Sequence, residues 1–445
     1  MLVPLSWLLE YVALDEPADA GEVARRLTAV GLEIESIEQV GQDIAGVVIA
    51  RVLEIEELAG YRKPIRYCRV TTGGPDAERS VICGAVNFAA GDLVPLAVPG
   101  AVLPGGFEIR ASELYGKVSD GMICSASELG LGDDHSGIMV LPADAPLGAG
   151  FAAYAGLRDV VLDVNVTPDK GHALSIRGLA RELASAFGVA FTDPADAERP
   201  AWAAPGADGP GEQVYQASIG DPAACDRFAL REVRGIDPGR PTPLPMVVRL
   251  ARADTRSVSL AVDITNYVML ELGRPIHGYD ADTLTGTVGV RRAAPGERLT
   301  TLDGVDRELA PEDLVVVDDS GVIGLGGVMG GEHTEISAET TRVLVESAHW
   351  DATAMFRTGR RHKITSEAGR RNERGVDPAI CEAAADRVVE LMVRLGGASA
   401  DAGVTVAGAP PEPTVVSAAA DLPARITGMD LGTETAIEAL RVVGC

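Results

Sequence analysis

Short apolar runs of β type recur between residues 47 and 141 and limit what this stretch of chain can form. They lie at 47–49, 67–70, 80–83 and 93–98, and clusters of Gly, Pro and Asn separate them. Several short strands at such spacing are typical of a small β-barrel or β-sandwich. Because periodicity alone does not distinguish between the two, we expect a small β domain of either kind.

Strand-then-helix patterns lie on both sides of this β region. Before it, residues 1–40 contain a short strand and then a helix that ends near Gly31. After it, residues 160–166 alternate as a half-buried strand does, and Ser175 can cap a helix with one apolar face. Because the two flanks share this pattern, we predict that 1–40 and 152–190 form one small α/β domain with the β domain inserted into it.

The length of 445 residues is too great for one hydrophobic core, since single cores stop growing at about 250–300 residues. We place the β domain at 41–151 and a larger mixed α+β region at 213–400. Stretches rich in Ala, Pro, Asp and Gly at 191–212 and 401–413 are predicted linkers. Residues 414–445 begin a further unit too short to close a core, so we expect the chain to be part of a longer protein.

The cysteines and the N-terminus bear on the compartment. The six cysteines are scattered without a C-x-x-C pair, which argues against a disulfide framework and a structural zinc site. The N-terminus lacks the basic segment of a signal peptide. No run approaches the roughly 18 apolar residues of a membrane span. We expect a cytoplasmic protein with no membrane partner and no metal site of its own.

The net charge of −26 taken alone argues against a nucleic-acid binder, whose affinity depends on neutralising phosphates. Residues 357–374 are an exception, with seven basic groups opposed in sequence by Glu367 and Glu373. Two interpretations stay open for this basic run. It is either a solvated face or a site for RNA, and in the second case Arg360, Arg361 and Lys363 are our candidates.

The densest glycine cluster lies at residues 324–331. It does not match G-x-G-x-x-G because position 329 is Met, and it lacks the Lys-Ser/Thr of a P-loop. Glycines allow a backbone to approach a ligand or a strand closely. The cluster therefore favours a tight turn that lines a pocket over a nucleotide site, and a nucleotide-dependent enzyme remains a competing hypothesis.

Two titratable residues, Glu346 and His277, have both a functional and a purely structural interpretation when the sequence is considered alone. Glu346 follows the apolar run 343–345, where a carboxylate is costly unless it has a partner or a task. The alternative is a strand-end glutamate pointing at solvent, and composition alone favours it. His277 lies in a turn-rich segment, and a lone histidine is usually structural. No Ser/His/Asp or Cys/His arrangement is visible.

Seven motifs in order along nearly the whole chain are more informative. They are VPGAVLPGG at 98–106, DGMICS at 120–125, LSIRGLAREL at 174–183, TNYVMLE at 265–271 with GRPIH at 273–277, GVMGG at 327–331, VESA at 345–348 and ERGVDP at 373–378. Together they resemble the bacterial phenylalanyl-tRNA synthetase β subunit.

The resemblance implies an α+β multidomain fold. An OB-fold β-barrel of tRNA-binding type at 41–151 would be inserted in the small α/β domain, and an editing region of B3/B4 type would occupy 213–400. Residues 414–445 would begin a B5-like domain. The family's partners are an α subunit, in an α₂β₂ assembly that carries the aminoacylation site, and tRNA(Phe). The ligands for Mg²⁺ and ATP would lie beyond residue 445 or on the partner subunit.

The resemblance also implies proofreading. An apolar pocket shaped for Phe rejects Tyr by only about a hundredfold, so a second site must hydrolyse Tyr-tRNA(Phe). In the family a glutamate at the position of Glu346 binds the phenolic hydroxyl. Thr265, Asn266 and His277 could orient the ester and the attacking water, and we assign no general base. The residues that match the family's editing pocket are Thr265, Asn266, His277, Gly327, Gly330, Glu346, Ser366 and Ala368.

The chain departs from the family pattern at several places. Ser366 stands where Thr is common, Gly369 replaces a common Ser, and Asn372 replaces an aromatic residue. Residues 58–65 and 169–172 also differ, and the first of these puts direct tRNA contact by the β domain in question. The alternative function is a tRNA-binding scaffold that has lost hydrolysis.

Overall fold

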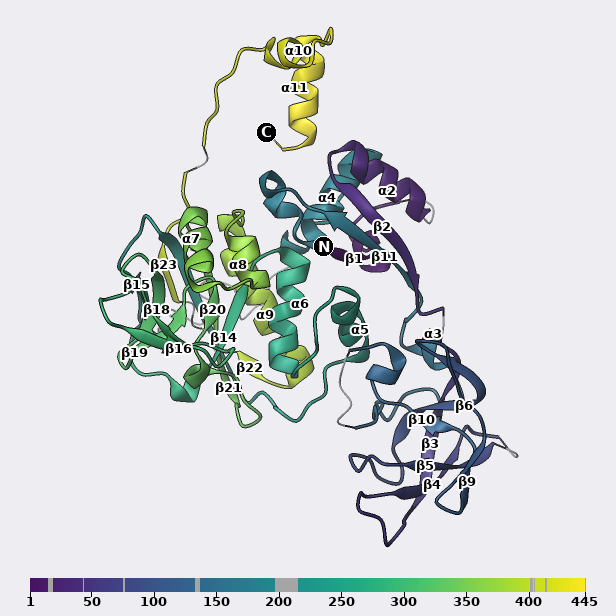
Figure 1. Cartoon of the computed structure of the whole chain (residues 1–445). Helices are drawn as coiled ribbons and strands as arrows, with labels where there is room; N and C mark the ends of the chain where they lie inside the picture. Colours follow the sequence, from purple (N-terminus) through teal and green to yellow (C-terminus); the bar gives the residue numbers. More distant parts are fainter. Residues whose placement is uncertain are drawn as a thin grey trace.

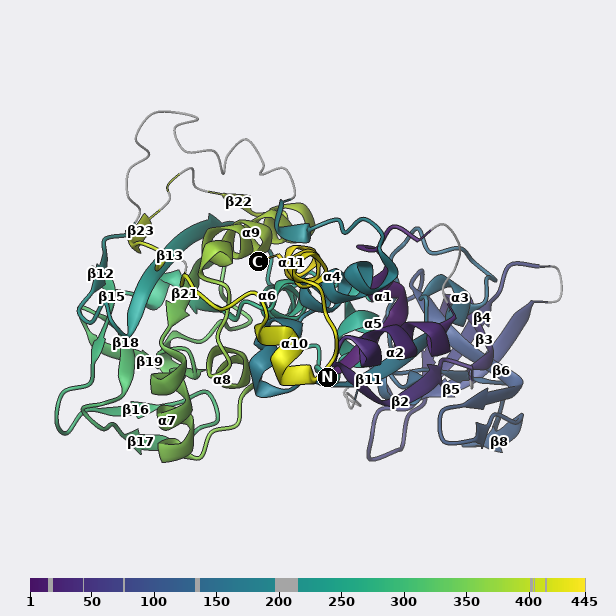
Figure 2. The ribbon, with the colours of Figure 1, turned by 90° about the horizontal axis from the view of Figure 1, so that it is seen from above.

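The computed structural model of the chain describes residues 1–14, 19–42, 44–74, 77–132, 137–196, 215–400, 403, 405–412 and 414–444. Within these ranges helices and strands are mixed along the chain, and the strands form six sheets. The mixed α+β class predicted from the sequence is confirmed. Figures 1 and 2 show three main groups of elements.

The first group, the N-terminal unit, combines segments from both sides of the β region. Strand β11 lies between β1 and β2 and is antiparallel to both, with Leu162 opposite Val3 on one side and Ile37 on the other. The predicted cap of α4 is confirmed, since the Gly178 N–H donates to the Ser175 hydroxyl at 2.9 Å. The unit contains β1 (Leu2–Pro4), α1 (Leu5–Leu9), α2 (Ala20–Ala29), β2 (Glu33–Val40), β11 (Asp159–Asn165) and α4 (Ile176–Phe187).

The second group is the β region, an antiparallel sheet of order β10-β6-β3-β4-β5 with β7 paired to β6. Alternate residues of β3 enter two cores, Val47 and Ile49 on one face and Ala50 and Val52 on the other. The pairings among the described residues do not close a barrel, so the OB-fold stays a prediction. Its strands are β3 (Ala45–Glu57), β4 (Arg66–Thr71), β5 (Glu78–Cys83), β6 (Leu93–Leu103), β7 (Phe107–Glu108) and β10 (Met122–Ile123), with a small hairpin β8 (Ser112–Leu114) and β9 (Lys117–Ser119).

The third group, the C-terminal region, contains two larger sheets. One has the order β14-β21-β13-β22 with β23 also on β13, and the other has the order β12-β15-β18-β19-β20. The apolar runs 314–317 and 322–323, with the turn-forming residues DDSG between them, predict a hairpin, and β18 and β19 confirm it. The strands of the two sheets are β12 (Ala217–Ile219), β13 (Cys225–Arg234), β14 (Ile276–Asp280), β15 (Val288–Arg292), β18 (Leu314–Asp318), β19 (Gly321–Leu325), β20 (Met329–Gly330), β21 (Arg342–Trp350), β22 (Ser399–Ala400) and β23 (Thr405–Gly408).

Helices complete the C-terminal region. α6 and α9 pack on the β21 sheet, and α7 and α8 follow directly after β21 in the chain (Figure 1). The sequence Asp377-Pro378 is typical of a helix start and predicts a helix that runs to about Leu395, and α9 confirms it. These helices are α5 (Leu244–Arg252), α6 (Leu260–Leu272), α7 (Ala352–His362), α8 (Glu367–Asn372) and α9 (Cys381–Gly396), and a separate hairpin joins β16 (Arg298–Thr300) to β17 (Asp306–Glu308).

Strand β21 is buried on both faces. Val343 and Val345 enter the core shared with α6 and α9, whereas Leu344, Ala348 and Trp350 enter a second core between the two sheets. Successive side chains of a strand point to opposite faces, so position 346 also points between the sheets. The interpretation of Glu346 as a strand-end residue facing solvent is therefore wrong, because the strand continues four residues past it to Trp350.

The N-terminal unit and the C-terminal region share one hydrophobic core, although the sequence suggests separate domains. Trp7 stacks on Tyr267 with ring centroids 4.6 Å apart, and the Tyr11 hydroxyl donates to Glu271 at 2.8 Å. Figure 2 shows the N-terminal unit between the β region and the C-terminal region. The predicted domain boundaries themselves remain predictions.

The two predicted linkers are only partly described. Residues 197–214 lie outside the described residues, and Phe191 before them bridges to Val12. The prediction that 401–413 is a linker is wrong for its central residues, because β23 pairs with β13 there and extends the sheet.

The last helices stand apart from the other groups in Figure 1. α10 (Leu422–Thr427) and α11 (Thr433–Val442) bury no residue. In the described part of the chain, no helix is both long and apolar enough to cross a membrane.

Candidate functional site

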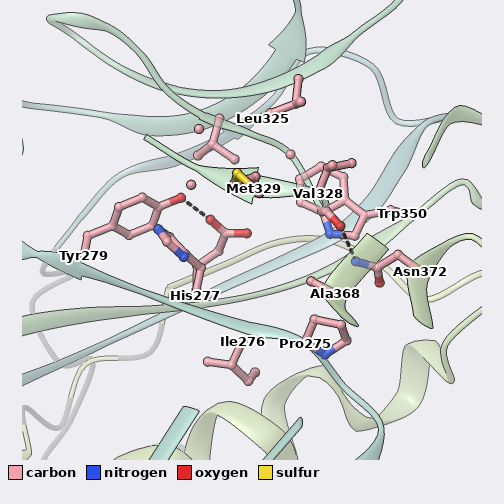
Figure 3. Close-up of a pocket in the computed structure, with 16 residues that line it drawn as sticks. Pro275, Ile276, His277, Tyr279, Leu325, Val328, Met329, Trp350, Ala368 and Asn372 are labelled. Carbon is pink, nitrogen blue, oxygen red and sulfur yellow. Dashed lines mark hydrogen bonds between the residues drawn. The ribbon is translucent and has the colours of Figure 1, made fainter. Parts of the chain in front are cut away.

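A cavity opens between the two sheets of the C-terminal region (Figure 3). It holds about 450 Å³ of space free of atoms, its open mouth included. β14, the end of β19, the glycine turn at 326–328, β20, β21 and α8 all contribute to its wall. The prediction that the glycine cluster lines a pocket is confirmed.

The strand register brings the two chemically interesting residues together. β14 and β21 are antiparallel, and His277 lies directly opposite Glu346. Tyr279, two residues along β14, points to the same face as His277, and their rings meet edge to face with centroids 4.4 Å apart. All three side chains line the cavity.

Glu346 is a buried carboxyl with one partner among the described residues. Its side chain accepts a hydrogen bond from the Tyr279 hydroxyl, and the residue is only 6% exposed. Burial raises the pKa of Glu346 to about 7, and the Tyr279 hydrogen bond opposes that rise. The group can therefore exchange its charge near neutral pH, which is a property of functional carboxyls.

His277 is held in its neutral form. Burial lowers the pKa of His277 to about 4, so the ring is a weak base at pH 7. Its Nε2 atom is buried and has no hydrogen-bond partner in the described structure. A buried polar atom left without a partner costs about 1–3 kcal/mol, so a ligand or water in the cavity is the natural partner.

Two positions of the turn must be glycine because other side chains lie too close to leave room for a Cβ atom. Gly327 has a φ of +66°, and a Cβ there would lie 2.6 Å from the Met355 sulfur. A Cβ on Gly330 would lie 2.3 Å from Cε1 of His277. The turn can lie this close to the cavity only because both positions lack a side chain.

Residues that depart from the family pattern anchor this turn. The Ser366 hydroxyl donates to the carbonyl of Val328 at 2.7 Å, and the Asn372 amide donates to the carbonyl of Gly327 at 2.8 Å. Ser366 also caps α8 by accepting from the Gly369 N–H. The departures therefore keep the turn in place, and Ala368 between them lines the cavity.

Thr265 and Asn266 do not line the cavity. Both lie on α6, the helix that precedes β14, and the Thr265 hydroxyl donates to the carbonyl of Val262 at 2.8 Å. The structure brings together His277, Glu346, Gly327, Gly330 and Ala368 of the predicted pocket. Ser366 acts on the turn from outside the lining.

The basic run divides into structural and exposed residues. Arg361 pairs with the buried carboxylate of Asp313, which also accepts from His362 at 2.7 Å. Arg371 is buried and donates to the carbonyl of Leu174 at 3.0 Å. Arg360 stacks over the Phe356 ring and lines a second cavity with Lys363 between α7 and α8.

The sequence prediction did not include several residues of the cavity wall, and two of these make side-chain hydrogen bonds there. Tyr279 and Asn372 belong to the cavity wall. The period of two along β14 was a usable signal for Tyr279, since it must share a face with His277. Nothing local indicated Asn372, because its role comes from tertiary contact with the turn.

The described residues include no group of three or more His, Cys, Asp or Glu placed to hold a metal ion. The resemblance places the family's Mg²⁺ ligands beyond residue 445 or on the partner subunit. The chemistry at the cavity is that of a neutral imidazole, a titratable carboxyl and a phenol in an apolar wall.

Comparisons with known proteins identify the class. A B3/4 domain model matches residues 224–397, and a model for a putative tRNA binding domain matches residues 47–150. The chain thus combines a domain of tRNA-binding type with a B3/4 domain that contains the cavity. The phenylalanine–tRNA ligase beta subunit of Thermobifida fusca (strain YX) is 54% identical over 100% of this chain, and that of Streptomyces avermitilis is 50% identical over the same share.

The chain belongs to the phenylalanine–tRNA ligase β-subunit family. It spans 53% of the length of each of these two relatives. A solved N-terminal fragment of the phenylalanyl-tRNA synthetase beta subunit from Pyrococcus horikoshii has a TM-score of 0.28 at 12% identity, covering 64% of this chain and 77% of that one. That TM-score is too low to indicate a shared overall arrangement.

Proposed function

We propose that the C-terminal region hydrolyses tyrosine esterified to tRNA(Phe), within a phenylalanine–tRNA ligase whose aminoacylation site lies on an α subunit. The observation that supports this most is the buried carboxyl of Glu346 in the cavity wall, opposite His277. A buried carboxyl that reads a hydroxyl can favour tyrosine over phenylalanine, because phenylalanine leaves one of its two oxygens without a donor.

The roles follow from the chemistry of each group. Glu346 accepts the phenolic hydroxyl of the mischarged residue. His277, neutral at pH 7, orients the ester carbonyl or the attacking water through its unpartnered Nε2 rather than acting as a strong base. Gly327 and Gly330 let the ester pass close to the backbone. Thr265 and Asn266 lie outside the lining, on α6, the helix that packs against β14.

The rest of the assembly is proposed from the family. The β region would be an OB-fold that contacts tRNA, which its match to a putative tRNA binding domain supports. The assembly would be α₂β₂ in the cytoplasm, and ATP and Mg²⁺ would be bound outside the described residues. Arg360 and Lys363 are exposed and would contact RNA near the cavity, whereas Arg361 is held by Asp313.

The test is deacylation of Tyr-tRNA(Phe) and Phe-tRNA(Phe) by the protein assembled with its α partner, compared with Glu346→Ala. We expect selective hydrolysis of Tyr-tRNA that loses its tyrosine preference in the variant. If the native assembly charges tRNA with Phe but spares both esters, the region is a tRNA-binding scaffold instead.

A further inference from the structure

The hydroxyl of Tyr279 already binds the carboxyl that is proposed to read a substrate hydroxyl. It donates to Oε2 of Glu346, drawn as a dashed line in Figure 3. Both residues are buried in the cavity wall, Tyr279 at 1% exposure. The protein therefore presents to its own carboxyl the same chemical group that a tyrosine ester would present.

A carboxylate can accept more than one hydrogen bond. Its two oxygens offer about four lone-pair sites, so one phenol does not saturate it. Among the described residues, no donor reaches the second oxygen, Oε1. Tyr279 thus leaves a defined position for a second hydroxyl while it restricts the rotation of the carboxyl about its terminal bond.

We propose that Tyr279 is the positioning residue for Glu346, holding Oε2 so that Oε1 accepts the hydroxyl of a tyrosine-like substrate. This inference rests on the proposed function. The competing role is a plug, in which the Tyr279 hydroxyl competes with the substrate for the carboxyl and must move away. The two roles predict opposite effects when the hydroxyl is removed.

The pH dependence of the tyrosine preference distinguishes this role from a packing role, because a loss of packing alone would not change it. Removing the Tyr279 hydrogen bond raises the pKa of Glu346 further, because that bond opposes the effect of burial. A neutral carboxyl accepts a phenol more weakly than an ionised one, since charge-assisted bonds are roughly twice as strong. Tyrosine preference should therefore appear at higher pH in a variant without this hydroxyl.

The other titratable groups around Glu346 are few. His277 faces it from β14. On β13 the residue opposite it is the apolar Leu230, and Cys225 lies further along that strand, opposite Trp350. Burial and the nearby Glu346 raise the pKa of Cys225 above its usual range, so the thiol stays neutral. The parts of the lining that come from β18, β19, β20 and α8 carry no charged side chain. A shifted pH midpoint in a Tyr279 variant is thus assigned to Glu346.

The experiment compares Tyr279→Phe with the native protein, each assembled with the α partner. The ratio of kcat/KM for Tyr-tRNA(Phe) and Phe-tRNA(Phe) is measured from pH 5.5 to 9. We expect the preference for Tyr to fall about tenfold at pH 7 and its pH midpoint to rise. Tyr215→Phe is the matched control, because the Tyr215 hydroxyl donates only to the Ala281 carbonyl at 3.4 Å and lies outside the cavity lining.

A second variant keeps the shape of the site. 3-Fluorotyrosine at position 279 is a stronger donor, so the pH midpoint should move down instead of up. An unchanged midpoint in both variants overturns the inference, and a stronger tyrosine preference in Tyr279→Phe establishes the plug in its place. Native protein with no tyrosine preference overturns the proposed function itself, which separates the two failures.

Discussion

Glu346 and His277 face each other across two strands with pKa shifts of opposite direction. Burial favours the neutral form of each, so it raises the pKa of the carboxyl to about 7 and lowers that of the imidazole to about 4. The raised carboxyl pKa gives stability that is present below pH 4.5 and lost as pH rises to 7. The lowered imidazole pKa has the opposite effect, with stability lost as pH falls from 6.5 to 4.

The substitution Glu346→Gln should reveal how much the carboxyl contributes to the pH dependence of stability. Glu346→Gln removes the carboxyl titration, so its unfolding free energy relative to the native protein should rise between pH 4.5 and 7 by up to about 3 kcal/mol and then level off. Thermal unfolding of both proteins across pH 4 to 8 measures the difference. Glu335→Gln, at an exposed carboxyl, is the control and should show no such rise. A constant offset for Glu346→Gln would contradict the expectation.

At this scale the density of glycines alone predicts the turn that lines the cavity, whereas His277 and Glu346 are predicted as site residues only through the family resemblance. Composition alone favoured a solvent-facing Glu346, because the strand was thought to end there. The partner of Glu346 was not predicted, since hydrogen bonds between strands depend on a register that a single sequence does not fix.

At the scale of elements, a buried carboxylate accepts hydrogen bonds from the C-terminal turn of α7 and holds it in place. Asp313 lies 0% exposed and accepts from Thr358 at 3.1 Å, from His362 and from Arg361. In the basic run, Arg361 therefore serves the fold, as the buried Arg371 does, whereas Arg360 and Lys363 are exposed. The sequence of the basic run alone does not distinguish its structural residues from its exposed ones, because Asp313 lies far away along the chain.

Substitutions in α7 should separate stability from RNA binding. Arg361→Ala should lower the unfolding free energy by about 2 kcal/mol, because Asp313 loses a charged donor. Arg360→Ala with Lys363→Ala should leave stability unchanged, weaken tRNA binding and reduce the slope of log affinity against log salt by about 2. Arg394→Ala, an exposed arginine on α9, is the control. An unchanged slope in the double variant would remove these residues from the RNA site.

Elements with strong local signals were predicted well, namely the α4 cap, the β18–β19 hairpin and α9. β23 was interpreted as linker because its four residues carry no pattern of their own. The strand forms only because β13 offers an edge for pairing.

At the scale of the whole molecule, α5 joins all three groups. Met246 and Leu250 enter the core of the N-terminal unit and the C-terminal region, whereas Leu244 and Val248 enter a core of the β region. Beside it, Glu271 is fully buried and accepts from Tyr11 and from two nitrogens of Arg387 at 2.9 and 3.0 Å. The predicted domains are therefore not independent bodies.

Loss of the Glu271 carboxylate should destabilise the contact between the N-terminal unit and the C-terminal region. Glu271→Ala leaves the Arg387 cation without its buried partner, so we expect the unfolding free energy to fall by about 3–5 kcal/mol. Urea unfolding and limited proteolysis measure the loss. Glu390→Ala, at a less buried partner of the same arginine, is the control and should cost under about 1 kcal/mol. Equal losses in both variants would contradict a special role for Glu271.

Strand β21 has a further consequence for how this gene can vary. Its alternate side chains serve the helical core on one side and the cavity on the other, so a shift of one residue would place Val345 or Ser347 where Glu346 stands. A single-codon insertion or deletion within 342–350 would therefore exchange the two faces at once. Among descendants of this chain that keep the cavity, alignment gaps in this strand should be absent or come in pairs.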